Sequence, residues 1–193
     1  MKKILIILAL LCSLTAFTIM NNSWVNDPPH SQLAFTVKHF SINEVTGYFK
    51  DFKVEIDAPN LDFNSAKISM SANISSIDTR VEARDNHLRS PDFFDEAKYP
   101  TLSFISTSIS QDDDDKNEYD VVGDLTMHGI TKQIKLELEY KGKTINPTNK
   151  QEIIAFVIKG NLYRSDFGIG SKFADNFISN KVEIRGDGEF VKR

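Results

Sequence analysis

The sequence holds a single cysteine, Cys12, in 193 residues, so no disulfide can form within the chain. It also lacks the motifs of several enzyme classes, since G-x-S-x-G, H-E-x-x-H and G-x-G-x-x-G are all absent. Its histidines show none of the i, i+2 or i, i+4 spacings that place two zinc ligands on one element. We therefore predict no catalytic residue, no metal and no cofactor, although a cluster assembled in three dimensions stays open. The histidines are His30, His39, His87 and His128.

Positive charge is scarce relative to negative charge. The chain has 23 lysines and arginines against 27 aspartates and glutamates, a formal net charge of −4, and no basic stripe. Because nucleic-acid binding draws its affinity from cationic contacts to phosphates, we expect no nucleic-acid partner. The acidic run Asp112–Asp115 lacks the spaced ligands, the glycine and the terminal glutamate of a calcium loop, so it predicts a solvated hairpin tip.

A long hydrophobic run occurs once, at the N-terminus. Two lysines precede the uncharged segment "ILIILALLCSLTAFTIM", which is the arrangement of an export signal. We predict a signal peptide over residues 1–22, with cleavage after Ala16 or Thr18 both open. A membrane anchor is the alternative, since about 17 to 20 apolar residues can span a bilayer. The residue before Cys12 is large where lipidation sites need a small one, so lipid attachment there is disfavoured.

From Gln32 onward, apolar and polar residues alternate with period two, which is typical of half-buried strands. The segments "KISMSANISS" and "IKLELEY" show the alternation most clearly. Turn-forming segments such as "DAPNLD" and "KGKTINPTNK" separate about eight predicted strands. Their approximate ranges are 33–40, 45–56, 67–76, 101–110, 119–127, 134–140, 153–163 and 181–191.

Many antiparallel strands, each with one apolar face, predict an all-β barrel or sandwich. Fourteen phenylalanines favour the barrel, because aromatic rings can line a hollow as well as fill a core. An eight-stranded barrel is either just filled by side chains or holds one small ligand, and the pattern leaves both cases open. Helix is confined to short pieces within 80–98 and around 172–177. Without an internal repeat or a linker, residues 23–193 make one domain.

The stretch "RVEARDNHLRSPDFFD", residues 80–95, is the densest in chemically useful groups. A proline separates its charged half from Phe93 and Phe94, because the residue before proline avoids helical geometry. We interpret the stretch as a gate at the mouth of a barrel, with Arg84 and His87 facing an anionic ligand group. The alternative is a structural tie between a crossover loop and the barrel rim.

Five segments occur in order and together span nearly all of residues 24–193. With them the chain resembles the YceI-like family of lipid-binding or polyisoprenoid-binding proteins. The third segment, followed by "GDLTMHGITK", carries most of the specificity. The segments are "WVNDPPHSQLAFTVKHF", "VTGYFKDFKVEID", "ISSIDTRVEARDNHLRSPDFFDEAKYPTLSF", "VVGDLTMHGITKQIKLELEY" and "LYRSDFGIG".

The resemblance implies a lipocalin-like eight-stranded antiparallel β-barrel with short helical segments near its mouth. It also implies a periplasmic, often homodimeric protein that encloses a long apolar chain and performs no known chemistry. Contacts of Arg84 and His87 with a lipid head group are our physical inference beyond the resemblance. The inward-facing positions that the resemblance implies are Phe35, Val37, His39, Phe49, Phe93 and Phe94.

The leading hypothesis is an exported carrier or buffer of a polyisoprenoid or similar long-chain lipid, for transport, storage or stress protection. One alternative is a hydrolase or isomerase acting on such a lipid, with Asp85, His87 and a rim carboxylate as acid and base. Another is a fully packed barrel that serves as a stress or adhesion module. Transient membrane contact fits the carrier, although the acidic loop 111–120 discourages approach to an anionic surface on its side.

Overall fold

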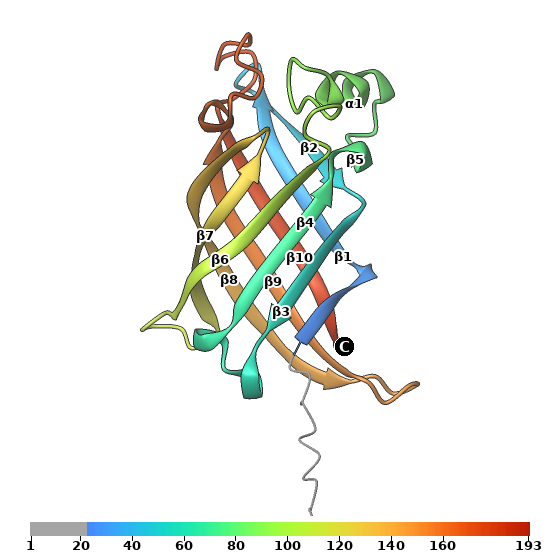
Figure 1. The fold of residues 1–193 in the computed structure, drawn as a ribbon, viewed down its shortest axis with the longest axis vertical. Helices are drawn as coiled ribbons and strands as arrows, with labels where there is room; N and C mark the ends of the chain where they lie inside the picture. The colour runs from blue at the N-terminus through green and yellow to red at the C-terminus, as the bar shows by residue number, and fades with distance from the viewer. Residues whose placement is uncertain (1–22) are drawn as a thin grey trace, which may run out of the picture.

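The computed structural model describes residues 23–193, so the predicted signal peptide and Cys12 lie outside the described residues. Strands dominate this part of the chain, which also holds one α-helix, α1 (Glu82–Arg89) (Figure 1). The strands are β1 (Ser23–His39), β2 (Asn43–Phe49), β3 (Phe52–Asp57), β4 (Lys67–Asn73), β5 (Ile77–Asp78), β6 (Thr101–Gln111), β7 (Glu118–Met127), β8 (Ile130–Ile145), β9 (Glu152–Tyr163) and β10 (Lys181–Lys192).

The strands form one antiparallel sheet that closes on itself. β10 pairs with β1 from Trp24↔Lys192 to Thr36↔Glu183, which joins the last strand to the first. β2 and β3 both pair with β1 and so share one position in the barrel. β4 and β5 share the next position, because β4 pairs with β3 and β5 pairs with β2. The ten segments therefore fill eight positions, which confirms the predicted eight-stranded antiparallel barrel.

Strand β1 begins earlier than the alternation pattern indicated. The pattern starts near Gln32, whereas β1 runs from Ser23 and pairs with β10 on both sides of a bulge. The bulge contains Pro28 and Pro29, which have no amide hydrogen to donate to a ladder. Asn26 pairs with Phe190 and Ser31 with Gly188, so residues 27–30 stand opposite a single residue of β10.

Two other predicted elements differ from the structure. The strand predicted over 45–56 is interrupted at residues 50–51, where β2 ends and β3 begins. The helix predicted around 172–177 is wrong, since this segment consists of turns. The cause lies in Arg164, whose buried guanidinium group binds the carbonyl groups of Gly170, Phe173 and Ile178. Those carbonyls are therefore held toward one side chain, in an arrangement that a regular helix does not allow. The helix predicted within 80–98 is confirmed as α1.

The rings of an aromatic cluster pack together at the end of the barrel where β3 connects to β4, which is the lower end in Figure 1. Phe63 lies in the connection between β3 and β4, with its ring centroid 5.1 Å from those of Tyr140 and Phe156 and 5.7 Å from that of Tyr119. Phe156 in turn contacts Phe190, with 5.6 Å between centroids. This burial of rings supplies a packed base at one end of the barrel.

The opposite end carries α1, the turn between β1 and β2, and the segment 164–180 (Figure 1). We call this end the mouth. Backbone hydrogen bonds join its parts: Phe40 N–H donates to the carbonyl of Phe177, and Gly170 N–H donates to that of Asp92. No helix among residues 23–193 is both long and apolar enough to cross a membrane.

Candidate functional site

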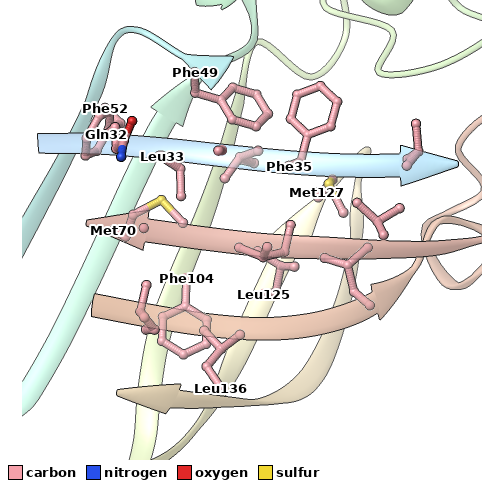
Figure 2. Close-up of a pocket in the computed structure, with 18 of the residues that line it drawn as sticks. Gln32, Leu33, Phe35, Phe49, Phe52, Met70, Phe104, Leu125, Met127 and Leu136 are labelled. Atoms are coloured by element: carbon pink, nitrogen blue, oxygen red, sulfur yellow. The ribbon is translucent and has the colours of Figure 1, made fainter. Parts of the chain in front are cut away.

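The barrel encloses a cavity of about 480 Å³ whose lining is almost entirely apolar. Its volume falls in the range of roughly 300 to 1,000 Å³ that is usual for sites of small molecules. Figure 2 shows Phe35, Phe104 and Leu125 on strands around this space. Phe156 and Phe190 of the aromatic cluster line its lower part, and His39 and Phe177 line it at the mouth. The interior of the barrel is therefore hollow and is not filled by side chains.

All of the predicted ligand-contact residues line this one cavity. The inward-facing aromatic rings contact one another: the centroids of Phe35 and Phe49 lie 5.6 Å apart, and those of Phe49 and Phe94 lie 6.1 Å apart. Their role in binding a ligand stays a prediction. The residues are Phe35, Val37, His39, Phe49, Arg84, His87, Phe93 and Phe94.

Glycines on neighbouring strands give the large side chains of the wall their positions. Phe35 of β1 stands directly opposite Gly47 of β2, and a Cβ added to Gly47 would lie 2.4 Å from Cζ of Phe35. Gly123 of β7 lies diagonally across from Phe104 of β6, and a Cβ added to Gly123 would also lie 2.4 Å from Cζ of that ring. The rings therefore lie over backbone that has no side chain, which keeps them against the wall. The role of these glycines could not be predicted from the sequence, because a glycine in a strand shows its purpose only when the cross-strand neighbour is known.

An aromatic stack spans the mouth and includes two residues that sequence analysis missed. The rings of Phe93 and Phe173 stack with centroids 5.1 Å apart, and the rings of Phe173 and Phe177 stack at 5.8 Å. His87 packs edge-on against Phe93 at 5.0 Å. Phe173 and Phe177 come from the segment 164–180, so two distant parts of the chain meet over the cavity. The two phenylalanines in "KFADNF" were the available signal, but their spacing alone did not place them at the mouth.

Asp92 links the same two parts of the chain by charge. Lys172 Nζ donates to Asp92 Oδ1 at 2.5 Å, and His87 Nε2 lies 3.3 Å from Asp92 Oδ2. The hydrogen bond from Lys172, followed by that from His87, lowers the pKa of Asp92 from its usual value. We call the set Asp92, His87 and Lys172 the latch.

Arg84 takes part in a network at the start of α1. Its Nε donates to Thr79 Oγ1 and its Nη2 to the Thr79 carbonyl, both at 2.7 Å. Thr79 in turn donates from its backbone N–H and from Oγ1 to Asp85 Oδ1, at 2.8 and 2.5 Å. Arg84 is thus partly a structural tie. Arg84 also lines the cavity, and no carboxylate in residues 23–193 forms an ion pair with it.

Arg164 is a further residue that sequence analysis did not single out. It is buried and lines the cavity. Its guanidinium group donates to five backbone carbonyl groups of the segment 164–180, and burial lowers its pKa. Arg164 therefore shapes the mouth segment from within. The acceptors are the carbonyls of Ile169, Gly170, Phe173, Ile178 and Ser179.

Comparison with known proteins identifies the fold and its family. The YceI-like domain matches residues 24–190, which is nearly the whole described chain. The chain belongs to the YceI-like domain family. A UPF0312 protein of Staphylococcus epidermidis is 38% identical over 143 residues, which cover 74% of this chain and 80% of that protein. A UPF0312 protein of Staphylococcus aureus is 36% identical over the same length.

Solved structures share the YceI-like barrel. The YceI protein of Campylobacter jejuni is 29% identical and superimposes with a TM-score of 0.72, covering 81% of this chain and 90% of that one. BcnA of Burkholderia cenocepacia reaches a TM-score of 0.75 at 19% identity, over 87% and 99% of the two chains. A polyisoprenoid binding domain from Saccharophagus degradans reaches 0.64 at 13% identity, over 89% and 99%. The fold of the YceI-like domain is therefore the same in all three.

Proposed function

We propose that this YceI-like protein binds a polyisoprenoid or similar long-chain lipid inside its barrel and carries or stores it as an exported, periplasmic protein. The observation that carries the proposal is the apolar cavity of about 480 Å³, which reaches the mouth and has a packed aromatic base. The fold shared with a polyisoprenoid binding domain of Saccharophagus degradans is compatible with the same class of ligand.

The energetics favour a long apolar ligand. Burying a methylene contributes about 0.8 kcal/mol, so a chain of several isoprene units gains a large gross stabilisation. Part of this gain is offset by the ordering of a flexible chain and by the loss of its free motion. A short hydrocarbon would bury too few methylene groups to bind tightly. A chain that follows the full depth of the cavity would bury enough of them to exceed these costs.

The contacts at the mouth favour binding over catalysis. A hydrolase or isomerase would use Asp85 and His87 as acid and base. Asp85 is buried and accepts two hydrogen bonds from Thr79, while His87 faces Asp92. The bonds from Thr79 give Asp85 a structural role at the start of α1, so we do not assign it as the acid or base of a reaction. The cavity likewise argues against a fully packed stress or adhesion module.

The mouth also supports transient contact with a membrane as part of this function. Three large apolar side chains are exposed there, namely Phe40 at 53%, Ile42 at 89% and Phe177 at 39%. The rings of Phe40 and Phe177 lie 4.9 Å apart, and Phe177 also lines the cavity. The apolar surface is therefore continuous from the outside to the interior. The acidic hairpin tip between β6 and β7 lies toward the opposite end (Figure 1), so it does not oppose a mouth-first approach.

Two experiments test the proposal. Native mass spectrometry of protein purified from isoprenoid-rich cells should show a bound lipid that organic extraction removes, and a mass without ligand would count against a carrier. Sedimentation with vesicles should show binding that Ile42→Ser weakens. Ile105→Ser is the matched control, because Ile105 is 61% exposed on β6. If both variants lost vesicle binding equally, the mouth would not be the surface that contacts the membrane.

A further inference from the structure

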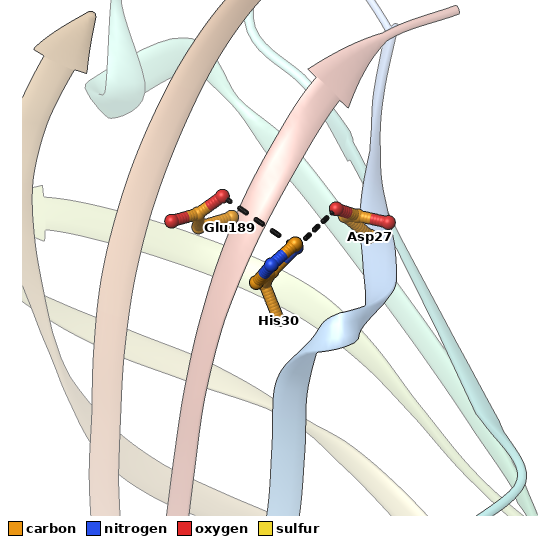
Figure 3. Close-up of side chains that lie close together, drawn as sticks. All are labelled: Asp27, His30 and Glu189. Atoms are coloured by element: carbon orange, nitrogen blue, oxygen red, sulfur yellow. Dashed lines mark hydrogen bonds and ion pairs between the residues drawn. The ribbon is translucent and has the colours of Figure 1, made fainter. Parts of the chain in front are cut away.

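Three side chains with metal-binding groups meet on the outside of the barrel, away from the mouth. His30 Nδ1 lies 2.7 Å from Asp27 Oδ2 and 4.0 Å from Glu189 Oε2. Figure 3 shows His30 between the two carboxylates, with Asp27 and His30 on β1 and Glu189 on β10. One ligand atom from each of the three lies within 4.8 Å of the others.

The local backbone presents these groups in a restricted arrangement. Asp27 and His30 are the two ends of the bulge "DPPH", and Glu189 is the single residue of β10 that faces this bulge. Pro28 and Pro29 have φ angles restricted by their rings, so the spacing between Asp27 and His30 varies little. A site whose ligands are held in place before binding loses less conformational entropy when the ion arrives.

The donor set matches a divalent transition metal ion. One imidazole nitrogen and two carboxylate oxygens suit Zn²⁺ and its neighbours, whereas Mg²⁺ and Ca²⁺ prefer oxygen donors alone. Ligand atoms around a tetrahedral zinc ion lie about 3.3 Å apart when the bonds are about 2.0 to 2.1 Å long. The separations of 2.7 and 4.0 Å lie on either side of this value. To reach this value, Asp27 and His30 must move slightly apart and Glu189 must move toward His30, which their partly exposed side chains allow.

The charges of the cluster also favour a bound cation. Two carboxylates face one imidazole, and in residues 23–193 no lysine or arginine forms an ion pair with Asp27 or Glu189. A cation between the two carboxylates is therefore favoured by charge, and a divalent ion placed there would offset both negative charges.

We propose that Asp27, His30 and Glu189 form a surface site for a divalent transition metal ion of the zinc class, with water completing the coordination. The ion ties the bulge of β1 to β10 at the seam that closes the barrel, where four residues of β1 leave the regular ladder. Asn26, next to the bulge, already links β1 to β3 on its other side. Its Oδ1 accepts a hydrogen bond from Val54 N–H at 2.7 Å. The metal stabilises the closed barrel, and this role is independent of what the cavity binds.

Zinc binding to purified protein without a polyhistidine tag tests the site. Calorimetric titration with ZnCl₂ near neutral pH should show one ion per chain, and the melting temperature should rise as Zn²⁺ is added. MgCl₂ should give neither effect. His30→Ala and Glu189→Gln should each weaken the zinc affinity about tenfold or more, because even loss of a residue that only orients a ligand costs this much. His30 is exposed and Glu189 is only half-buried on the outside of the barrel, so both variants should fold.

The matched control is Glu183→Gln, which removes the same charge from another exposed position of β10. It should leave both the zinc affinity and the zinc-dependent rise in melting temperature unchanged. No binding of Zn²⁺ at millimolar concentration would overturn the proposal and leave a hydrogen-bonded ion pair. Equal affinity in the wild type and in all three variants would place the ion elsewhere and would overturn it too.

Discussion

The ring of Phe35 lies over Gly47 of the neighbouring strand, so close that a Cβ on Gly47 would come within 2.4 Å of Cζ of Phe35 and 2.8 Å of Cγ2 of Thr79. This contact joins the wall of the cavity to the network at the start of α1, because Thr79 binds both Arg84 and Asp85. A single methyl group at position 47 should therefore disturb the cavity and the mouth together.

Gly47→Ala should push the ring of Phe35 into the lumen. We expect a loss of about 1 to 3 kcal/mol in the free energy of unfolding, as is usual for an overpacked core, and weaker uptake of long-chain lipid. Chemical denaturation and a lipid-binding titration measure the two effects. Phe35→Leu removes the clashing ring, so the double variant should recover part of the lost stability. Strictly additive losses would show that the ring and the glycine do not interact.

Phe35→Asp should place an uncompensated carboxylate in the apolar cavity. The expected cost is several kcal/mol of folding free energy, unless the group stays protonated with a raised pKa. Thr36→Asp is the control, because the next residue of β1 points to the outer face, where Thr36 Oγ1 contacts Thr46 Oγ1 at 2.9 Å. A Phe35→Asp protein that kept both the melting temperature and the lipid uptake of the wild type would refute the inward assignment.

Arg84→Ala should weaken binding of a phosphorylated lipid more than binding of its neutral counterpart. The expected difference is about 1 to 3 kcal/mol if a charge-assisted hydrogen bond to the head group is lost. Loss of the bonds to Thr79 affects both lipids alike, so the difference between them isolates the head-group contact. Arg89→Ala is the control, because it removes the same charge from α1 at a residue that does not line the cavity. An equal loss for both lipids would make Arg84 a structural tie only.

The contribution of the latch to stability should fall at low pH. The pKa of Asp92 is lowered in the folded protein by its bonds to Lys172 and His87. Its contribution to stability is therefore present above the ordinary aspartate pKa, about 3.9, and is lost as the pH falls through the lower folded pKa. Lys172→Gln removes the first partner and should raise the pKa of Asp92 in a carboxyl NMR titration. Asp166→Asn, at an exposed carboxylate of the same mouth segment, should leave that pKa unchanged. An Asp92 pKa that Lys172→Gln did not move would remove Lys172 from the latch.

Much of the barrel could be predicted because side chains alternate between the two faces of a strand. The pattern located the later strands well, but it missed the first part of β1, where the two prolines of the bulge interrupt the alternation. It also joined β2 to β3 across residues 50–51 and predicted a helix around 172–177. These errors concern places where tertiary contacts, such as those of Arg164, override the local preference of the chain.

The sequence by itself determined the antiparallel strands, because period-two alternation assigns each residue of a strand to a face. The eight-stranded barrel and the inward-facing residues followed from the resemblance to the YceI-like family. Only the tertiary structure decided that the interior is hollow, since the free volume depends on which side chains meet across strands. Phe63 fills one end because three other rings surround it. Phe35 and Phe104 leave the centre open because glycines lie beneath them. The cluster of Asp27, His30 and Glu189 likewise exists only through folding, which brings the last strand of the chain beside the first.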